Sequence, residues 1–252
     1  MVDFVQAPNL PLDADIVIIG EKYADKLAKP IEKFGINPIF APNNPKVDPR
    51  LTGHADLSVF HAGGERIYLA PYLRGSEFAK KLKALGADII YADIAQSPIY
   101  PNDAQLNIAA IGSSLIFNPK SSYLPAVNYS TIEHGYQSIS CKQGYAKCAA
   151  LVVNERSLIT QDPGIACTAI AAGLGVLQIS PDGVALDGFF CGFIGGAGFK
   201  LNTGELAFTG TLDALPDKPR ILAFLAERNI TPVYLTDSPI FDIGSAIPLT
   251  EK

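Results

Sequence analysis

Five short apolar segments recur along the chain at nearly constant spacing, and this repetition constrains the fold more than any other feature of the sequence. Each segment has the length and the apolar run of a buried β-strand. Counted from Ile16 to Ile67, Leu115, Leu158 and Leu206, the successive spacings are 51, 48, 43 and 48 residues. A regular period of this size predicts a chain assembled from repeated supersecondary units. The segments are residues 15–19, 66–70, 114–117, 157–160 and 205–209.

Each of these strands is followed by a helical or turn-rich stretch and a second strand, after which a loop leads to a third strand. Helices are predicted over residues 23–34, 76–85 and 218–228, and Gly35 and Gly86 stand where helix C-caps favour glycine. The second strands are predicted at residues 37–41, 88–92, 137–141, 176–179 and 232–235. The third strands are predicted to begin near Asp56, Gln105, Lys147, Phe193 and Asp242.

These units predict one α/β domain of five modules around a pseudo-fivefold axis, an α/β propeller. The modules span approximately residues 14–60, 61–108, 109–150, 151–196 and 197–249 within a single domain of residues 1–252. The last third strand, residues 241–248, has no hairpin partner after it, so the segment before Asp15 is expected to pair with it and close the ring. The third module is the weakest, because residues 121–134 contain Pro125 and no clean helical stripe. A four-module open sheet and a plain α/β sandwich stay open as alternatives.

Charge and composition exclude several classes of function. The chain carries 20 Lys and Arg against 25 Asp and Glu, a net charge of −5, with no basic run of the kind that binds a phosphate backbone. We therefore expect no nucleic-acid partner. The N-terminus lacks a secretory signal pattern, and Thr168 and Gln178 interrupt the longest apolar stretch, so we expect no membrane association and a cytoplasmic protein. The four cysteines form no CxxC pair and only three histidines are present, so we expect reduced thiols, no metal and no cofactor.

Five such modules resemble the pentein fold, that of the guanidine-group-modifying enzyme superfamily, over nearly the whole chain. Residues 53–60, Gly-His-Ala-Asp-Leu-Ser-Val-Phe, are similar to the His-x-Asp segment that carries the catalytic histidine of arginine deiminases. Residues 142–148 and 192–198 suggest a bacterial branch outside the characterised enzymes of the fold. The resemblance implies one of two functions: an enzyme whose cysteine thiolate attacks a guanidinium carbon, or a non-catalytic binding protein like the ribosome anti-association factors of this fold.

Reactive side chains gather in the loops between second and third strands, which the predicted ring directs toward its axis. Attack on a guanidinium needs a thiolate, a proton donor and carboxylates that hold the planar cation. His54 and Cys148 lie 94 residues apart, about two modules, and a similar separation occurs in cysteine enzymes of the pentein fold. The resemblance implies that Cys148 is the nucleophile and His54 the general acid or base. Those enzymes place the cysteine near the C-terminus, whereas this chain has none after Cys191, so the resemblance requires a shifted order of modules.

Carboxylate and amide side chains of the same loops are the expected partners of the cation. Asp56 is expected to join His54 and Cys148 in catalysis, by holding the substrate or by orienting the imidazole. The expected substrate-binding residues are Asp103, Asn102, Gln143, Asp187 and Asp242. The predicted substrate is a small guanidino or amidino compound, and the predicted reaction is a hydrolysis or an amidino transfer.

Cys148 also has a structural interpretation, because it begins the apolar run 148–153 and such cysteines are more often core residues. Consecutive strand residues face opposite ways, so only one of Lys147 and Cys148 is expected to face the pocket, and the sequence leaves open which. A Cys148 buried behind its strand would favour the binding protein, with a protein partner. A nucleophilic Cys148 is expected to be partly a thiolate near neutral pH.

Overall fold

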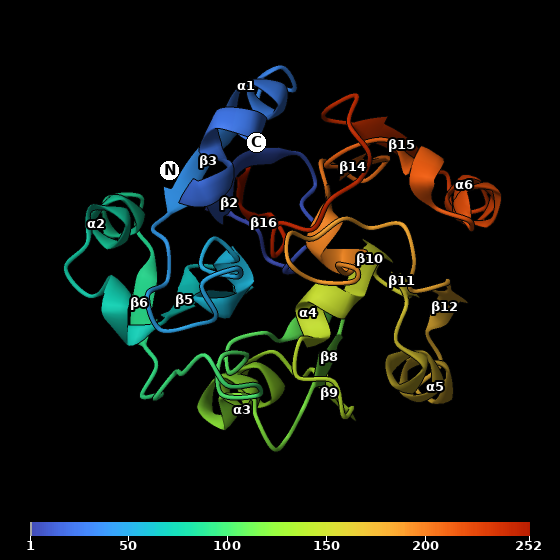
Figure 1. Cartoon of the computed structure of the whole chain (residues 1–252). Helices are drawn as coiled ribbons and strands as arrows, with labels where there is room; N and C mark the ends of the chain where they lie inside the picture. Colours follow the sequence, from blue (N-terminus) through green and yellow to red (C-terminus); the bar gives the residue numbers. More distant parts are fainter. Residues whose placement is uncertain (1) are drawn as a thin grey trace.

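The computed structural model describes residues 2–252, and in this part of the chain five small sheets stand about a common centre (Figure 1). Each sheet contains an antiparallel pair of strands followed by a parallel pair, and the four-stranded sheet has one additional antiparallel pair. Sheet by sheet, the strands are β1 (Asp3–Phe4), β16 (Ile247–Glu251), β2 (Ala14–Gly20) and β3 (Asn37–Ala41); β4 (Val59–Gly63), β5 (Arg66–Leu69) and β6 (Asp88–Tyr91); β7 (Ala109–Ile111), β8 (Ser114–Phe117) and β9 (Gln137–Ser140); β10 (Ala150–Asn154), β11 (Ser157–Thr160) and β12 (Gly175–Gln178); and β13 (Gly198–Lys200), β14 (Glu205–Phe208) and β15 (Thr231–Tyr234).

A helix connects the two parallel strands of every sheet, because parallel neighbours require a crossover. These helices lie on the outside of the molecule (Figure 1). Pro125 falls in the first turn of the third helix, where a missing N–H is tolerated, so the third module forms its helix after all. The four-module open sheet and the plain sandwich are therefore wrong. The helices are α1 (Ala24–Glu32), α2 (Glu77–Ala84), α3 (Leu124–Glu133), α5 (Pro163–Ala171) and α6 (Lys218–Ala226).

Each of the more amphipathic helices buries one face. Leu27 and Ile31 of α1, and Ile221 and Leu225 of α6, are four residues apart and completely buried. This spacing places each pair on one side of its helix, against the core that the neighbouring sheets share. Within residues 2–252, no helix combines the length and the apolar character needed to cross a membrane.

The two ends of the chain meet in the first sheet. β16 lies between β1 and β2 and is antiparallel to both, with Phe4 opposite Thr250 and Ile18 opposite Ile247. The prediction that the N-terminal segment pairs with the last strand is confirmed for β1, but most of the pairing is with β2 itself. The last strand also begins at Ile247 and not near residue 241.

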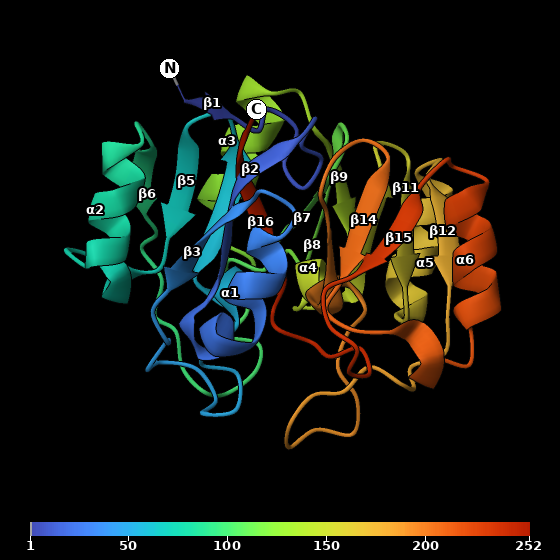
Figure 2. The same ribbon diagram turned by 90° about the horizontal axis from the view of Figure 1, so that it is seen from above.

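The third strands begin later than predicted, and in three of the five a short helical turn occupies the chain just before the strand. These turns are η2 (Ala55–Leu57), α4 (Ala146–Ala149) and η4 (Gly195–Ala197), ahead of β4, β10 and β13. In Figure 2, α4 and the long loop between β12 and β13 lie at the same end of the sheets. This end carries the polar side chains considered next.

Candidate active site

Cys148 and His54 line one cavity, although 94 residues separate them in the sequence. The cavity has a volume of about 450 Å³, and Gln143 and Asp242 also line it. Cys148 comes from α4, and His54 directly precedes η2, so helical turns ahead of two different sheets position the pair. Cys148 therefore faces a space of the size that holds a small ligand and does not pack behind its strand.

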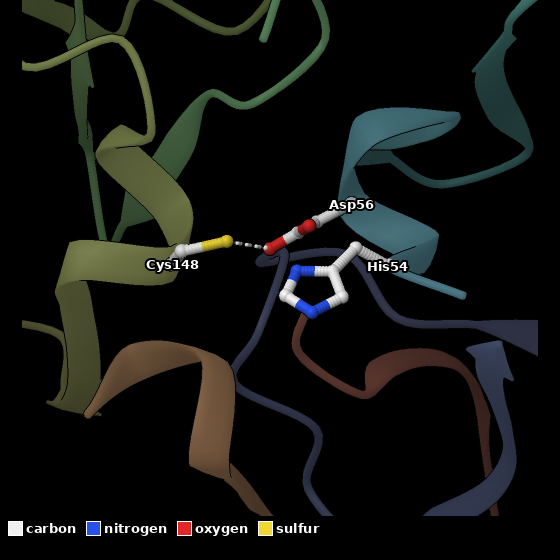
Figure 3. A group of neighbouring side chains, drawn as sticks. All are labelled: His54, Asp56 and Cys148. Atoms are coloured by element: carbon white, nitrogen blue, oxygen red, sulfur yellow. Dashed lines mark hydrogen bonds between the residues drawn. The ribbon is translucent and has the colours of Figure 1, made fainter. Parts of the chain in front are cut away.

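Cys148 is held by hydrogen bonds from two directions. Its thiol donates to Asp56, with 2.8 Å between Sγ and Oδ2 (Figure 3). On another side, Asn107 Nδ2 donates to Sγ at 3.3 Å. The same Asn107 side chain accepts the backbone N–H groups of Lys147 and Cys148 through Oδ1, at 2.6 and 3.2 Å. Asn107 thus fixes both the sulfur and the helical turn that carries it.

Lys147 does not line this cavity, which answers the question that strand alternation left open. Residues 146–149 form a helical turn, yet the neighbouring side chains of Lys147 and Cys148 still diverge. Lys147 Nζ donates to Ser245 Oγ at 3.2 Å, and the Ser245 hydroxyl lies 2.9 Å from Asp56 Oδ2. A buried cation is therefore connected to the Asp56 carboxylate through one hydroxyl group.

Burial dominates the protonation of this cluster. It raises the pKa of Cys148 well above the usual range of a thiol, and the negative charges of Asp56 and Asp242 raise it further. Burial also raises the pKa of Asp56, against the positive influence of His54 and Lys147. It lowers the pKa of Lys147, which Asp56 partly offsets. This direction disfavours a thiolate at Cys148 in the ligand-free protein, and the partial thiolate near neutral pH stays a prediction.

Two polar atoms of the cluster have no hydrogen-bond partner within residues 2–252, His54 Nε2 and Asp56 Oδ1. His54 is only 3% exposed, and buried polar atoms in proteins are nearly always paired. Gly244 makes the space for this histidine: its φ is +67°, and a Cβ there would lie 2.3 Å from the Cβ of His54. The cluster thus holds one imidazole nitrogen and one carboxylate oxygen buried without a hydrogen-bond partner.

The remaining expected site residues divide into two groups. Asp242 and Gln143 lie in the cavity wall, and Asp242 accepts backbone N–H bonds from Gly244 and Phe193, both at 2.8 Å. Asp103, Asn102 and Asp187 do not line it.

Contact of these three residues with a substrate stays a prediction. Asp103 is buried and accepts a hydrogen bond from the hydroxyl of Tyr145, which itself lines the cavity, so Asp103 positions an aromatic wall. Asn102 is exposed, and Asp187 lines a neighbouring cavity of about 400 Å³. Ring symmetry brings the loops together, but the direction of each side chain depends on local turns that the repeat does not specify.

A family model described as a family of unknown function, DUF6873, matches residues 18–247. The chain belongs to this family. A search of curated proteins found no match. Among solved structures, the DUF6873 protein is similar to substrate-bound agmatine deiminase from C. jejuni, at 8% identity and a TM-score of 0.58, over 100% of this chain and 97% of that chain.

Two amidinotransferases are similar over comparable lengths. The inosamine-phosphate amidinotransferase StrB1 from Streptomyces griseus is 11% identical with a TM-score of 0.56, over 100% of this chain and 97% of that chain. SxtG, an amidinotransferase from Microseira wollei, is 11% identical with a TM-score of 0.52, over 95% of this chain and 96% of that chain. The DUF6873 protein has the pentein fold, as its repeated modules implied.

Sequence reasoning missed the residues that hold Cys148 in place. Asn107, Cys148 and Ser245 each stand two residues before the strand that begins the antiparallel pair of its sheet, β7, β10 and β16. The three polar side chains are therefore equivalent when the modules are aligned on the observed strand starts, whereas the starts expected near Gln105, Lys147 and Asp242 do not align them. The aromatic wall, Tyr100 and Tyr145 with ring centroids 5.2 Å apart, carries no comparable signal, because loop tyrosines are common.

The cluster of His54, Asp56 and Cys148 also has the composition of a metal site. One ligand atom from each of the three lies within 4.8 Å of the others, and mixed nitrogen, oxygen and sulfur ligands suit Zn²⁺. The thiol and the carboxylate already satisfy each other through their hydrogen bond. The expectation of a metal-free site stays a prediction.

Proposed function

We propose that the DUF6873 protein is a cysteine-dependent hydrolase, or an amidinotransferase-like enzyme, that acts on a small guanidino or amidino compound. Cys148 is the nucleophile, His54 the general acid and base, and Asp56 and Asp242 hold the cation. The observation that carries the proposal is the shared cavity: Cys148, His54 and Asp242 line about 450 Å³, with Asp56 in hydrogen-bond contact with the sulfur. The proposal takes the five modules as one closed propeller domain in the cytoplasm that needs no metal or cofactor.

Substrate binding activates the thiol in this proposal. A guanidinium ion that enters the cavity meets Asp242 in its wall and lies near Asp56, which is hydrogen-bonded to the Cys148 sulfur; planar N–H donors pair well with carboxylates. A cation beside the sulfur opposes the two carboxylates that keep Cys148 protonated, and so lowers the pKa of its thiol. The thiol proton passes to Asp56 along the existing hydrogen bond, and the thiolate forms only when the substrate is bound.

The thiolate then attacks the guanidinium carbon, forming a carbon–sulfur bond while the carbon–nitrogen π electrons move to nitrogen. His54 in its protonated form gives a proton to the departing nitrogen, and the carbon–nitrogen bond breaks. This leaves an amidino group on Cys148 as an isothiouronium. Water attacks the same carbon and neutral His54 takes a proton from it. The carbon–sulfur bond then breaks, the remaining O–H proton is lost to solvent, and a urea or ureido product is released while the proton held by Asp56 returns to the Cys148 sulfur. An amine in place of water gives amidino transfer.

The similar structures support the proposal through their printed activities. They include an agmatine deiminase and amidinotransferases. A cysteine and a histidine that share one cavity of this fold therefore favour deiminase or amidinotransferase chemistry. At 8–11% identity, fold does not define reaction, so the residues of the cavity carry the argument.

A direct test follows the release of ammonia, urea and amine from a panel of guanidino compounds. We expect turnover by the wild-type protein, none by Cys148→Ser, and unchanged turnover by Cys141→Ser, whose buried thiol lies outside this cavity. Acid-quenched samples should contain an amidino adduct on Cys148 by mass spectrometry. Turnover by Cys148→Ser, or an adduct on another cysteine, would show that the proposal is wrong.

The second candidate is a non-catalytic binding protein with a protein partner. The raised pKa of Cys148 favours it, since a protonated, buried thiol is a poor nucleophile. Binding of guanidino compounds without any product or adduct would support this candidate.

A further inference from the structure

The cavity has a buried polar end and a more exposed aromatic end. His54, Cys148 and Asp242 are each 2–3% exposed, so the polar groups lie deep. Tyr100 and Phe189 are 47% and 37% exposed, and they line the same cavity. A ligand whose cationic head contacts the carboxylates must therefore extend its tail along the aromatic and aliphatic side chains.

The lining offers no counter-charge for such a tail. Among residues 2–252, the side chains that line the cavity include neither lysine nor arginine, so none can pair with a carboxylate on the ligand. The acidic residue of the wall, Asp242, is buried at the polar end, and its two oxygens already accept the N–H groups of Gly244 and Phe193. A charged tail would lose its hydration without gaining an ionic partner from the lining, and the Arg50 guanidinium beside Phe189 is already paired with Asp48 at 2.7 Å.

The neighbouring cavity of about 400 Å³ has two lysines, but both ammonium groups are engaged. Lys22 Nζ donates to the carbonyl of Arg50 at 3.1 Å, and Lys26 Nζ lies 3.4 Å from the ring centroid of Phe241. An anionic tail would have to displace one of these contacts. The structure therefore favours an uncharged tail over an anionic one.

We propose that the ligand of this site is a guanidine or amidine with an uncharged apolar or aromatic substituent. The inference rests on the proposed function for the position of the cationic head, and it adds the chemical class of the tail. Leu186, Phe189 and Phe193, from the loop of residues 181–193, supply the apolar wall. Arg50 holds this loop in place, since its NH1 donates to Gly188 O at 2.8 Å and its guanidinium lies 4.0 Å from the ring of Phe189.

Three ligands of matched length test the proposal: butylguanidine with an uncharged tail, agmatine with a terminal ammonium, and 4-guanidinobutanoate with a terminal carboxylate. Their dissociation constants are measured by calorimetry on Cys148→Ser, in which no turnover interferes. We expect agmatine and 4-guanidinobutanoate to bind at least about tenfold more weakly than butylguanidine. Methyl-, ethyl-, propyl- and butylguanidine should bind progressively tighter, by about fourfold for each added methylene, as for other buried methylenes.

The outcomes separate this inference from the proposed function. Tighter binding of agmatine or 4-guanidinobutanoate than of butylguanidine would overturn the apolar tail, even if wild-type protein turned over either compound. Tight binding of butylguanidine together with no product and no adduct on wild-type Cys148 would support the apolar tail and overturn the enzyme. Absence of binding by every guanidine would overturn both.

A pair of neighbouring phenylalanines provides matched variants. Phe189 lines the cavity, whereas Phe190 is 91% exposed and does not. Phe189→Ala should reduce the gain in affinity per methylene while leaving the affinity for methylguanidine within about twofold. Phe190→Ala should leave both unchanged. An equal effect of the two substitutions would contradict the assignment of the tail to this wall.

Discussion

Asp56→Asn is the substitution that most directly tests how the site controls its thiol. The Cys148 sulfur donates its hydrogen bond to Oδ2 of Asp56 at 2.8 Å, and the negative charge of Asp56 raises the pKa of Cys148. Asparagine keeps the shape and a hydrogen-bonding oxygen but removes the charge. Its amide N–H can also stabilise a thiolate. We therefore expect Cys148 to ionise more readily in the variant.

The size of the effect follows from the separation of the two groups. Two unit charges 2.8 Å apart interact by roughly 1.5 kcal/mol at the dielectric constant of water and by about 6 kcal/mol at an effective constant of about 20. The lower figure already gives about a tenfold larger thiolate fraction at a pH below the thiol pKa. A less basic thiolate is also a weaker nucleophile, with a coefficient of about 0.4–0.5, so the rate should rise by at least about threefold.

The assay compares two reagents of the same shape, neutral chloroacetamide and cationic chloroacetamidine. Alkylation of each cysteine is followed by mass spectrometry at pH 7, with rates divided by those for free cysteine. In the wild-type protein, chloroacetamidine should alkylate Cys148 at least about fivefold faster than chloroacetamide, because a charge 4 Å from the sulfur is worth about 1 kcal/mol even in water. Asp56→Asn should increase the rate at which chloroacetamide alkylates Cys148 and reduce the preference of Cys148 for chloroacetamidine over chloroacetamide.

A faster reaction with chloroacetamide together with a smaller ratio of the chloroacetamidine rate to the chloroacetamide rate is the diagnostic result. Equal slowing of both by Asp56→Asn would mean that Asp56 supports the local structure and does not set the charge of the site. Cys141 serves as an internal control, since burial raises its pKa to about 11 and it has no contact with Asp56. Its labelling should be slow and should not differ between the two proteins.

Two further predictions concern backbone space and a buried charge. Gly244→Ala should lower the free energy of unfolding by more than Gly173→Ala does, and it should abolish turnover. Both glycines have positive φ, but only Gly244 adjoins His54. Urea denaturation measures the first effect and the guanidino assay the second. Burial lowers the pKa of Lys200 to about 8 from 10.5, so its charge destabilises the fold fully below pH 8 and the cost vanishes as pH rises toward 10.5. Lys200→Met should therefore raise the free energy of unfolding at pH 7 by up to about 3 kcal/mol and much less at pH 10; an equal gain at both values would contradict this sign.

The fold was largely predictable because the apolar segments of the sequence recur with the same period as the structural modules. The five central strands and the helices after the first, second and fifth were expected from periodicity and from caps such as Gly35 and Gly86. The third helix has a weak sequence signal, because residues 121–134 lack a clean helical stripe and contain Pro125, which lies in the first turn of α3. The strand starts near the centre were displaced, because η2, α4 and η4 are helical turns too short to give a periodic signal.

The candidate site was predictable by residue type but not by direction. His54, Asp56, Cys148, Gln143 and Asp242 do gather at one cavity or in contact with it. A module spacing places loops relative to one another, and it does not say which way an exposed side chain turns or whether a carboxylate is already paired. For this reason the side chains of Asn102, Asp103 and Asp187 lie outside the wall of this cavity, and their contact with a substrate stays a prediction.

The protonated thiol and the apolar cavity belong to one physical argument. Burial and two carboxylates disfavour the thiolate of Cys148, and the same carboxylates attract a cation. A neutral molecule in the cavity leaves the thiol protonated, whereas a cationic head compensates the carboxylates and makes ionisation favourable. Selectivity for the head then comes from charge and selectivity for the tail from the aromatic wall, since Phe189 and Tyr100 discriminate by contact area and not by sign. A site of this kind keeps its nucleophile unreactive toward neutral electrophiles until the cation arrives.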